Sequence, residues 1–480
     1  MENSGLVELI KVLTNKELKD FMLFLESPYH NRGRYRKEAQ TLFKFLIKYA
    51  PNFESEKIGK EKAYRLIFPD ELFVEGRIEK VMVELSKSIR MFLLTEHYFR
   101  EENHLAAQTD FGQILKDRRL VQRAFNQVRA VLDDLKQDMF KNAQDYDRLY
   151  KASILAYSIE TEKNTWKEDF NIGKTLRFLD LYYYGSRLTL LNHYLLLSKF
   201  ARVNHEIDLP KEKQIDLLFE VAAEESPSIF VARKIFNLYS EGDPTPASFE
   251  VLLSLLRRYE PDIDAENLKF FFSYLRNYCT ALLTMGHQHL WPALHEIQRD
   301  NLDKGYFYYQ DAIPPGAFFS IANTALRVAK LDWAFAFIEA HKYKILGDNA
   351  TQDYYRLVYA NYLFAKGAYE ETLDYIPPAS PNMDFHLWAR RLELKTYFEL
   401  DSDLLSYKID AFKMYLSRSR QKILSENTYE VNVNFVNILN QMFQSKPGDS
   451  RRGETIYKRI QEKKQLHEKD WLIEKVKKLK

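Results

Sequence analysis

Apolar residues recur at helical spacing along nearly the whole chain, and this rhythm restricts the fold more than any other feature of the sequence. Residues 74–100 give one example, in which charged residues fill the opposite side of the segment. The apolar residues of that stripe are Ile78, Val81, Met82, Leu85, Ile89, Phe92 and Leu93. A stripe with the period of an α-helix predicts an amphipathic helix that faces a core on one side only.

The residues between such segments are typical of helix ends. Thr14 and Glu17 are spaced as a capping box, in which the hydroxyl accepts a first-turn N–H and the carboxylate reaches back. Glycine and proline number only 15 each in 480 residues, so we expect few turns and long helices. Further helix starts are expected after Ser226, Thr245 and Asp264, and helix ends at Gly242, Gly286 and Gly347.

These signals predict a continuous series of helices, among them 166–184, 186–203 and a C-terminal helix at 454–479. Helices joined by short connections run antiparallel, and so long a series cannot pack around one core. Stacked pairs solve this problem, because each pair buries its apolar faces against its neighbours. We therefore expect an all-α fold, an α-solenoid of antiparallel helical hairpins.

Residues 317–419 contain three helical pairs at nearly equal spacing. In the middle pair, Ala360 takes the place of a small residue at a close helix contact, Gly367 makes the turn, Tyr369 opens the second helix and Pro377 ends it. This pattern resembles a tetratricopeptide (TPR) repeat, whose length is about 34 residues. The matching positions of the flanking pairs are Trp333 and Leu404, 36 residues before and 35 residues after Tyr369.

The resemblance is incomplete, since Arg356 stands where the repeat has a bulky aromatic residue and the first pair lacks the turn glycine. It implies a right-handed superhelix with a concave face that binds peptides or helices of partner proteins and seldom catalyses. The alternative is a set of irregular antiparallel helices that happen to be evenly spaced. With the repeats included, we expect four regions: an N-terminal helical region at 1–103, a hairpin array at 104–300, TPR-like repeats at 301–445, and a linker with a basic C-terminal helix at 446–480.

The sequence offers no pattern typical of an enzyme. Residues 171–175 end like a phosphate-binding loop, but Glu168 stands where that loop needs a glycine. The single cysteine, Cys279, is expected to be a buried apolar residue. The spacing of the densest histidines indicates surface or capping roles and not a metal site: His287, His289, His295 and His341. We therefore expect no catalytic residue, cofactor or metal.

Two groups of residues are candidates for binding a partner. The basic arm contains Arg32, Arg34, Tyr35, Arg36 and Lys37. It precedes or opens a helix, where the helix dipole disfavours cations. Either local carboxylates, Glu26 and Glu38, offset this charge, or an external anion such as nucleic-acid phosphate does. The second group is aromatic and lies in the longest segment between helices: Tyr306, Tyr308 and Tyr309.

The C-terminal tail is also basic. Residues 451–480 hold eleven Lys and Arg against five Asp and Glu, after a linker expected at 446–450. One interpretation is a terminal helix that docks its Trp471 edge on the last repeat and caps the array. The others are a helix that binds nucleic acid or a membrane surface, although interspersed glutamates weaken both.

The overall charge of +2 gives no general reason to expect nucleic acid or membrane as a partner. No secretory signal and no apolar stretch of membrane-spanning length are found, so we expect a cytoplasmic protein. The function predicted from the sequence is that of a non-catalytic scaffold or adaptor of the helical-repeat type, which binds a protein or peptide. The alternative is a helical nucleic-acid-associated regulator that uses the basic arm and the C-terminal tail.

Overall fold

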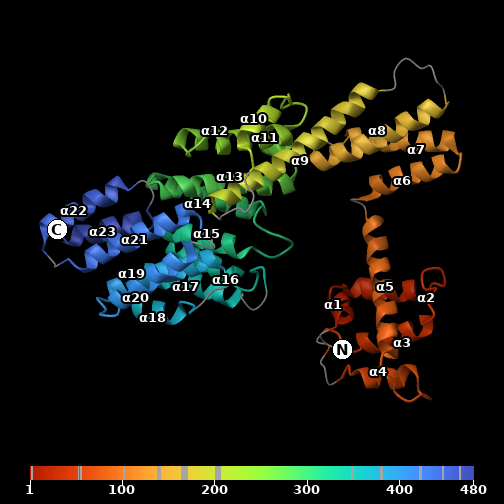
Figure 1. Cartoon of the computed structure of the whole chain (residues 1–480), viewed down its shortest axis with the longest axis horizontal. Coiled ribbons are helices and arrows are strands. Elements are labelled where there is room, and N and C mark those ends of the chain that lie inside the picture. The colour runs from red at the N-terminus through yellow and green to blue at the C-terminus, as the bar shows by residue number, and fades with distance from the viewer. Residues whose placement is uncertain are drawn as a thin grey trace. The chain divides into compact units, whose positions relative to one another are not determined.

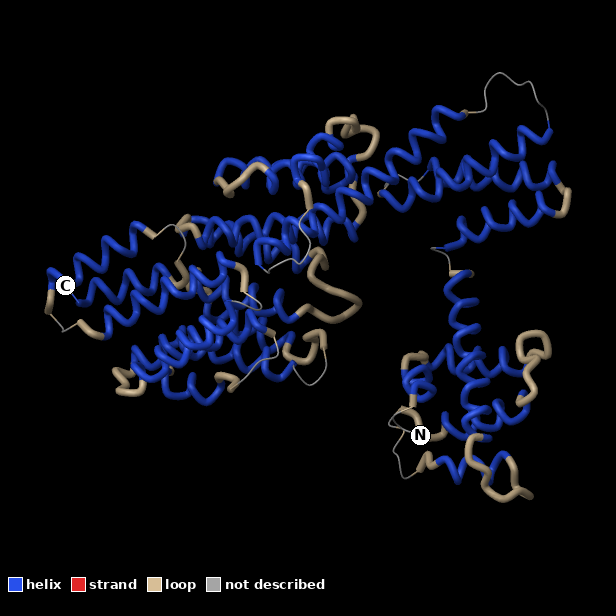
Figure 2. The backbone as a smooth tube through the Cα atoms, in the orientation of Figure 1, coloured by secondary structure: helices blue, strands red, loops and turns tan. Residues whose placement is uncertain are grey.

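The chain is all-helical in the computed structural model. The structure describes residues 1, 4–51, 53, 57–100, 103–137, 142–163, 171–200, 207–347, 351–378, 382–420, 424–445, 448–463 and 466–479. These residues form 23 α-helices and no extended strand (Figure 2). Two isolated bridges, Tyr309 with Ala312 and Ile313 with Ile345, are the β-type pairings within those ranges. The all-α class expected from the apolar rhythm is confirmed.

Contacts between residues divide the chain into two compact units. Unit 1 comprises Met1–Leu135 and Lys151–Phe170, and unit 2 comprises Lys136–Tyr150 and Asn171–Lys480. Figure 1 colours unit 1 from red to orange and most of unit 2 from yellow to blue. The four regions expected from the sequence do not coincide with these units and stay a prediction.

Unit 1 begins with five helices around one core. The longest, α5, contacts α1, α2, α3 and α4, and its buried stripe includes Ile78, Val81, Leu85 and Ile89, as the sequence predicted. Two further helices and the second part of α8 complete the unit, where a Cβ at Gly112 would lie only 2.7 Å from Val128 and 3.5 Å from Leu155. The bounds are α1 Gly5–Lys11, α2 Asn15–Glu26, α3 Arg36–Ile47, α4 Lys60–Ile67, α5 Arg77–Tyr98, α6 His104–Asp117, α7 Val121–Gln137 and α8 Ala143–Lys163.

Unit 2 is a series of helices in which α9 packs on α11 and each helix from α11 onward contacts the next. Consecutive pairs pack against one another, as in α15 with α16 and α17 with α18, and α15, α17 and α19 also contact in sequence. The first part of the series is α9 Ile172–Phe200, α10 Leu209–Asp216, α11 Pro227–Ser240, α12 Pro246–Tyr259, α13 Ala265–Thr284 and α14 Trp291–Asp303. The second part is α15 Pro315–Arg327, α16 Leu331–His341, α17 Thr351–Lys366, α18 Tyr369–Tyr375, α19 Met383–Glu399, α20 Leu405–Arg420, α21 Glu426–Phe443, α22 Ser450–Glu462 and α23 Lys469–Leu479.

Most of the helix ends that were predicted from capping residues agree with the structure. Thr14 and Glu17 form the capping box of α2, in which the Thr14 N–H donates to Glu17 Oε2 at 2.8 Å. Ser226, Thr245 and Asp264 cap α11, α12 and α13 through their side-chain oxygens. Gly242 and Gly286 directly follow the C-caps of α11 and α13 and have positive φ, which glycine adopts without strain. Gly347 also has positive φ, but α16 ends at His341, so the helix end predicted at Gly347 is wrong.

The three helical pairs in residues 317–419 share one turn geometry. Ala329, Gly367 and Asp401 all have positive φ, at 58°, 85° and 49°. At each turn the residue with positive φ donates its N–H three residues back, and the next residue donates five residues back. This is the Schellman arrangement, which satisfies the last carbonyls of a helix and turns the chain back. Alanine and aspartate therefore make the same turn as glycine in the flanking pairs.

Two further predicted helix boundaries are wrong. The expected break between 186–203 and the preceding helix is absent, because α9 runs unbroken through Gly185. Gly185 is needed for close packing, since a Cβ there would lie 3.0 Å from both Ala143 and Ile229. The expected single helix at 454–479 is two helices, α22 and α23, which pack on each other. Of the expected linker, Lys446 and Pro447 lie outside the described residues.

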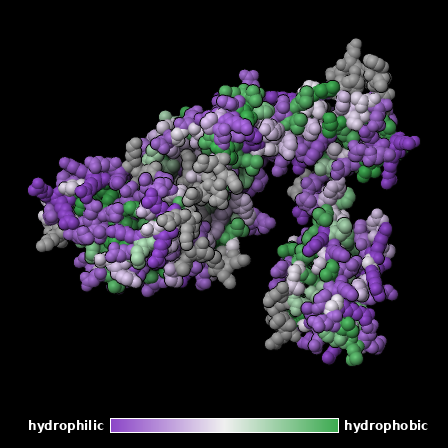
Figure 3. Space-filling view, in the orientation of Figure 1, coloured by the Kyte–Doolittle hydropathy of each residue, from purple (hydrophilic) through white to green (hydrophobic). Residues whose placement is uncertain are grey.

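The C-terminal hairpin, defined as α22 and α23, belongs to the core of unit 2. Ile456, Ile460, Leu472 and Val476 are buried in one cluster with residues of α19, α20 and α21. The outer side of α22 is hydrophilic in Figure 3 and carries exposed cations that include Arg451, Arg452 and Lys458. Within the described ranges, no helix combines the length and hydropathy needed to cross a bilayer.

We predict that Ala360→Trp lowers the free energy of unfolding by about 1–3 kcal/mol or more, because Ala360 is fully buried and a larger side chain would overpack the core. Thermal denaturation followed by circular dichroism measures the change. Ala365→Trp, on the exposed side of the same helix, is the matched control and should change stability little. Equal melting temperatures for the two variants would contradict the prediction.

Candidate functional site

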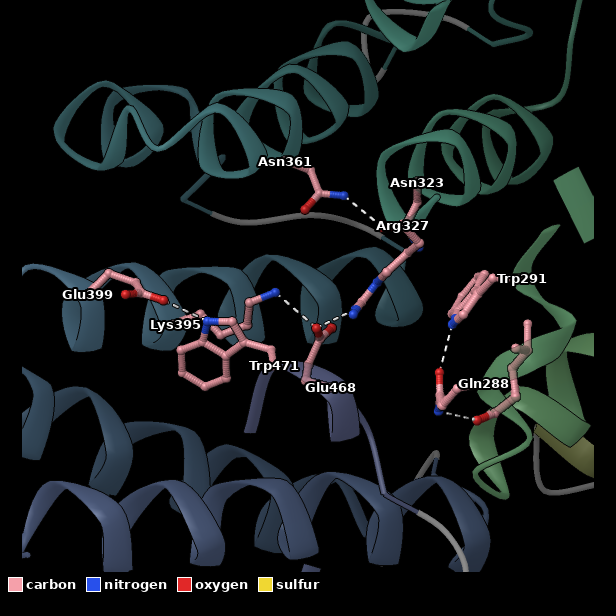
Figure 4. Close-up of polar contacts among 10 residues, drawn as sticks. Gln288, Trp291, Asn323, Arg327, Asn361, Lys395, Glu399, Glu468 and Trp471 are labelled. Atoms are coloured by element: carbon pink, nitrogen blue, oxygen red, sulfur yellow. Dashed lines mark hydrogen bonds and ion pairs between the residues drawn. The ribbon is translucent and has the colours of Figure 1, made fainter. Parts of the chain in front are cut away.

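A buried carboxylate in unit 2 joins helices that are far apart in the sequence. Glu468 precedes α23, and its side chain is 3% exposed. It accepts a hydrogen bond from Lys395 Nζ of α19 at 2.9 Å and another from Arg327 of α15 (Figure 4). The backbone of Glu468 has a positive φ of 57°, which orients the start of the helix. One side chain thus ties α15 and α19 to the C-terminal hairpin.

Aromatic rings and a second carboxylate extend this cluster along α19. Lys395 Nζ lies 4.5 Å from the centre of the Phe364 ring, within the range of a cation–π contact. The indole N–H of Trp471 donates to Glu399 Oε1 at 2.7 Å, and Lys475 Nζ lies 2.6 Å from the same oxygen (Figure 4 draws the former). The docking of Trp471 on an earlier helix agrees with the capping role expected from the sequence.

Burial and charge shift the pKa values of these groups in ways that keep the cluster ionised. Burial by itself would raise the pKa of Glu468, but Arg327, Lys395 and Arg391 hold it well below its usual range. Burial lowers the pKa of Arg391 to about 10, although Glu468 opposes the shift. Burial also lowers the pKa of His467 well below its ordinary value, so this imidazole is neutral near pH 7.

A cavity of about 230 Å³ lies beside Glu468. Its wall is formed by α13, α14, α15, the Trp388 ring of α19 and the segment 466–470. Several polar side chains are already engaged: Thr280, Thr284 and Thr324 donate to helix carbonyls, and Gln288 lies between the Leu283 carbonyl and the Trp291 indole (Figure 4). The cavity therefore combines aromatic rings with polar and charged side chains, several of which already have partners.

A second feature of unit 2 is a band of partly exposed aromatic rings, which we call the aromatic surface. It consists of Phe335 of α16, Tyr355, Tyr359 and Tyr362 of α17, and Tyr375 of α18. Successive ring centres are 4.8–5.8 Å apart, from Phe335 to Tyr362, Tyr359 and then Tyr355 or Tyr375. The three tyrosines of α17 are spaced by four and three residues, which places them on one face of the helix.

The residues of the basic arm lie in unit 1, at the start of α3. Arg32, Arg34 and Lys37 are exposed, and Arg32 lies 4.4 Å from the centre of the Tyr29 ring. Arg36 donates to the Glu26 backbone carbonyl at 2.9 Å and not to a carboxylate. The ion pairs with Glu26 and Glu38 that the sequence allowed are not formed by these cations among the described residues. Tyr35 is half-buried against the core of α1–α5.

The three tyrosines predicted as a binding group are divided in their roles. Tyr306 donates to Glu260 at 2.9 Å and stacks on Phe272, and the Tyr308 hydroxyl lies 2.8 Å from His341 Nε2. Both are therefore tied into the unit. Tyr309 is 46% exposed, and Lys269 Nζ lies 5.9 Å from the centre of its ring.

The histidine prediction needs a correction. His295 is 6% exposed and packs edge-on against Trp333, because it lies on the buried side of α14. Burial lowers its pKa. Among the described residues, no group of three side chains could hold a metal ion. Cys279 is buried, as expected, and burial raises the pKa of its thiol to about 12.

Sequence reasoning missed the Glu468 cluster, the cavity and the aromatic surface. Glu468 is one of five acidic residues in a basic tail and lies 141 residues from Arg327 and 73 from Lys395. An acidic residue within a basic segment gives no sequence signal of burial. The spacing of Tyr355, Tyr359 and Tyr362 was a detectable signal, but the same residues also fit the TPR-like pattern.

We predict that Glu468→Gln lowers the free energy of unfolding by about 3–5 kcal/mol near pH 7, because it leaves buried cations without their counter-ion. The folded-state pKa of Glu468 lies below its ordinary value of 4.5, so its stabilisation is present above that pH and is lost as the pH falls through the folded pKa. The difference between variant and parent should therefore shrink in acid.

Urea denaturation at pH 7 and at pH 3.5 measures both effects. Glu474→Gln, at an exposed position of α23, is the control, and its expected change in the free energy of unfolding is below about 1 kcal/mol. A Glu468→Gln variant that is as stable as the control variant at pH 7 would show that the ion pairs of Glu468 do not stabilise the fold.

Comparisons with protein-family models, with curated proteins and with solved structures find no match to this chain.

Proposed function

We propose that this chain is a cytoplasmic, non-catalytic scaffold of the helical-repeat type, an α-solenoid whose hairpins at 317–419 are TPR-like. Three equal Schellman turns at Ala329, Gly367 and Asp401 support the repeat. They lie 38 and 34 residues apart, close to the TPR length of about 34. Glu468 is ion-paired with Arg327 and Lys395, which is the arrangement of a structural contact and not of a catalytic acid or base.

The aromatic surface is the observation that carries this proposal. Tyrosine and phenylalanine are enriched in protein interfaces, because their rings bury much area at a low cost in side-chain entropy. The surface unites rings from three successive helices, so it exists only where the helical pairs stack. Phe335 and Tyr375 remain 41% and 36% exposed, and the rings between them are half-buried.

The surroundings of the aromatic surface favour a partner segment that carries cations among apolar residues. Burial raises the pKa of Tyr355 to about 12, and Glu339 adds to that shift, so the hydroxyl stays protonated. Glu339 and Glu371 both act on Tyr359, and burial again raises its pKa. Glu339 is already ion-paired with Lys342 at 2.6 Å, so the exposed Glu371 is the carboxylate that would attract a lysine or arginine, which can also stack on the rings.

We predict that a photo-crosslinking residue, p-benzoylphenylalanine, in place of Tyr362 captures a discrete protein partner in the native host. The same residue in place of Tyr407, an isolated tyrosine that is 70% exposed on α20, is the matched control. Gel electrophoresis and mass spectrometry identify adducts. Phe335→Ala and Tyr359→Ala should each reduce the adduct at position 362, since ring anchors dominate binding energy.

The scaffold proposal fails if position 362 yields no adduct, or if it yields the same diffuse set of adducts as position 407. Circular dichroism of each variant separates a loss of binding from a loss of fold.

The second candidate function is nucleic-acid binding through the basic arm. The specific observation is that Arg32, Arg34 and Lys37 are exposed and form no ion pair among the described residues, at a helix end where cations are unfavourable. Phosphates would offset this charge, and the Tyr29 ring beside Arg32 could stack on a base.

We predict for this candidate that a fluorescent single-stranded oligonucleotide binds at low salt, with a log–log salt slope that decreases in Arg32→Glu/Arg34→Glu. Lys16→Glu/Lys48→Glu makes the same change of charge at exposed positions of unit 1 outside the arm and should keep the slope. Fluorescence anisotropy measures both. No binding at low salt, or equal losses in the two double variants, would end the nucleic-acid proposal.

A further inference from the structure

The cavity beside Glu468 contains hydrogen-bond donors that the protein itself does not use. We propose that it binds a small organic acid, with the carboxylate held by Asn323 and Arg327 and the flat apolar part against the aromatic walls. This ligand site goes beyond the scaffold proposal, which depends on the aromatic surface and not on the cavity.

Asn323 is the first unused donor. It is 8% exposed, and it lines the cavity from α15. Its Oδ1 accepts a hydrogen bond from Asn361 Nδ2 at 2.9 Å (Figure 4). The Nδ2 group has no hydrogen-bond partner within the described part of the chain. This amide group is therefore available to an acceptor that enters the cavity.

Arg327 is the second donor, one helical turn after Asn323 on the same face of α15. A guanidinium has five N–H groups in a planar fork, and only Glu468 accepts from Arg327 among the described residues. Its charge centre also lies 5.7 Å from the centre of the Trp291 ring, which fixes the plane of the fork beside the cavity. A guanidinium binds a carboxylate through parallel N–H···O bonds, so Arg327 is the main donor of the proposed site and Asn323 adds a second.

The charged groups around the cavity have a net positive charge, which one more anion would balance. Four cations act there, Arg327, Arg391, Lys395 and Lys469. Three carboxylates oppose them, Glu468, Asp384 and Asp470, while His467 is neutral. Burial raises the pKa of both Asp384 and Asp470. A monoanion would balance the remaining positive charge in a region of low dielectric.

The size and walls of the cavity define the rest of the ligand. A volume of about 230 Å³ is below the range of about 300–1,000 Å³ that is usual for ligand sites, so only a small molecule fits. Phe319, Trp291 and Trp388 line it, and the Phe319 and Trp388 rings meet edge to face at 4.5 Å. Flat apolar groups pack well on such rings. The ligand class is therefore a small acid with an aromatic or planar group.

Binding of this ligand would also stabilise the docked C-terminal hairpin. The cavity wall includes Leu466, Glu468 and Asp470, which precede or open α23, opposite the donors of α15. A ligand that contacts both sides binds the docked state in preference to an undocked one, so it shifts the equilibrium toward docking.

The experiment is a titration of the full chain with 3-phenylpropanoate and with its neutral amide, 3-phenylpropanamide, followed by calorimetry at low salt. The proposal predicts saturable binding of the acid, at least tenfold tighter than the amide, and a higher melting temperature with the acid. The tripeptide Gly-Gly-Phe, which carries a free carboxylate on a longer chain, should bind more weakly than the acid.

Asn323→Asp is the test variant, because it keeps the shape and the acceptor for Asn361 but places a negative charge where the ligand carboxylate would lie. It should weaken binding of the acid at least tenfold. Asn440→Asp, outside the cavity on α21, adds the same charge and should leave binding unchanged. Equal affinity for acid and amide, tighter binding of the tripeptide, no binding of the acid, or equal losses in both variants would overturn the proposal. Capture at position 362 is independent of these outcomes, so failure here and failure of the scaffold proposal are distinguishable.

Discussion

Each helix of this chain has one apolar stripe, and both units depend on burying that stripe against neighbouring helices. Burial of apolar surface contributes about 25 cal/mol for each Å² removed from water, whereas isolated helices of this length are marginal. The helices therefore require one another. In unit 1 the requirement is met around α5, whose stripe from Ile78 to Phe92 is covered by α1–α4. In unit 2 it is met in sequence from α11 onward, each helix against the next, and several of the turns between them contain a residue with positive φ.

A stack of helices that is stabilised mainly by apolar contacts leaves its end and its register weakly specified. The Glu468 cluster supplies directional contacts at that place. Lys395 and Arg327 converge on one carboxylate from two different helices, and Trp471 and Lys475 both reach Glu399. Such contacts require one relative position of α15, α19 and α23. Buried ion pairs add little net stability compared with apolar residues of the same size, so their value here is in selecting one arrangement of the C-terminal hairpin.

The two proposed roles use different physical properties of unit 2. The aromatic surface offers large ring faces at the outside of α16–α18, which suits a protein partner with many moderate contacts. The cavity offers two donors and a positive balance in a small enclosed volume, which suits a small acid with few strong contacts. Because the cavity is bounded by the segment that opens α23, a ligand there can act on the docking of the hairpin without touching the aromatic surface.

The sequence by itself determined the helical class, the helix ends at Thr14, Ser226, Thr245 and Asp264, and the burial of Cys279. These features are local: they depend on residues within one or two turns, whose spacing is visible in the chain. Tertiary structure decided the rest. In the structure, α9 continues through Gly185, Ala329 and Asp401 make the same turn as Gly367, and His295 is buried against Trp333. Only the tertiary structure places Glu468 beside Arg327 and Lys395, which are 141 and 73 residues away in the sequence. The strength of these ion pairs depends on packing that excludes water, and this packing cannot be read from the sequence.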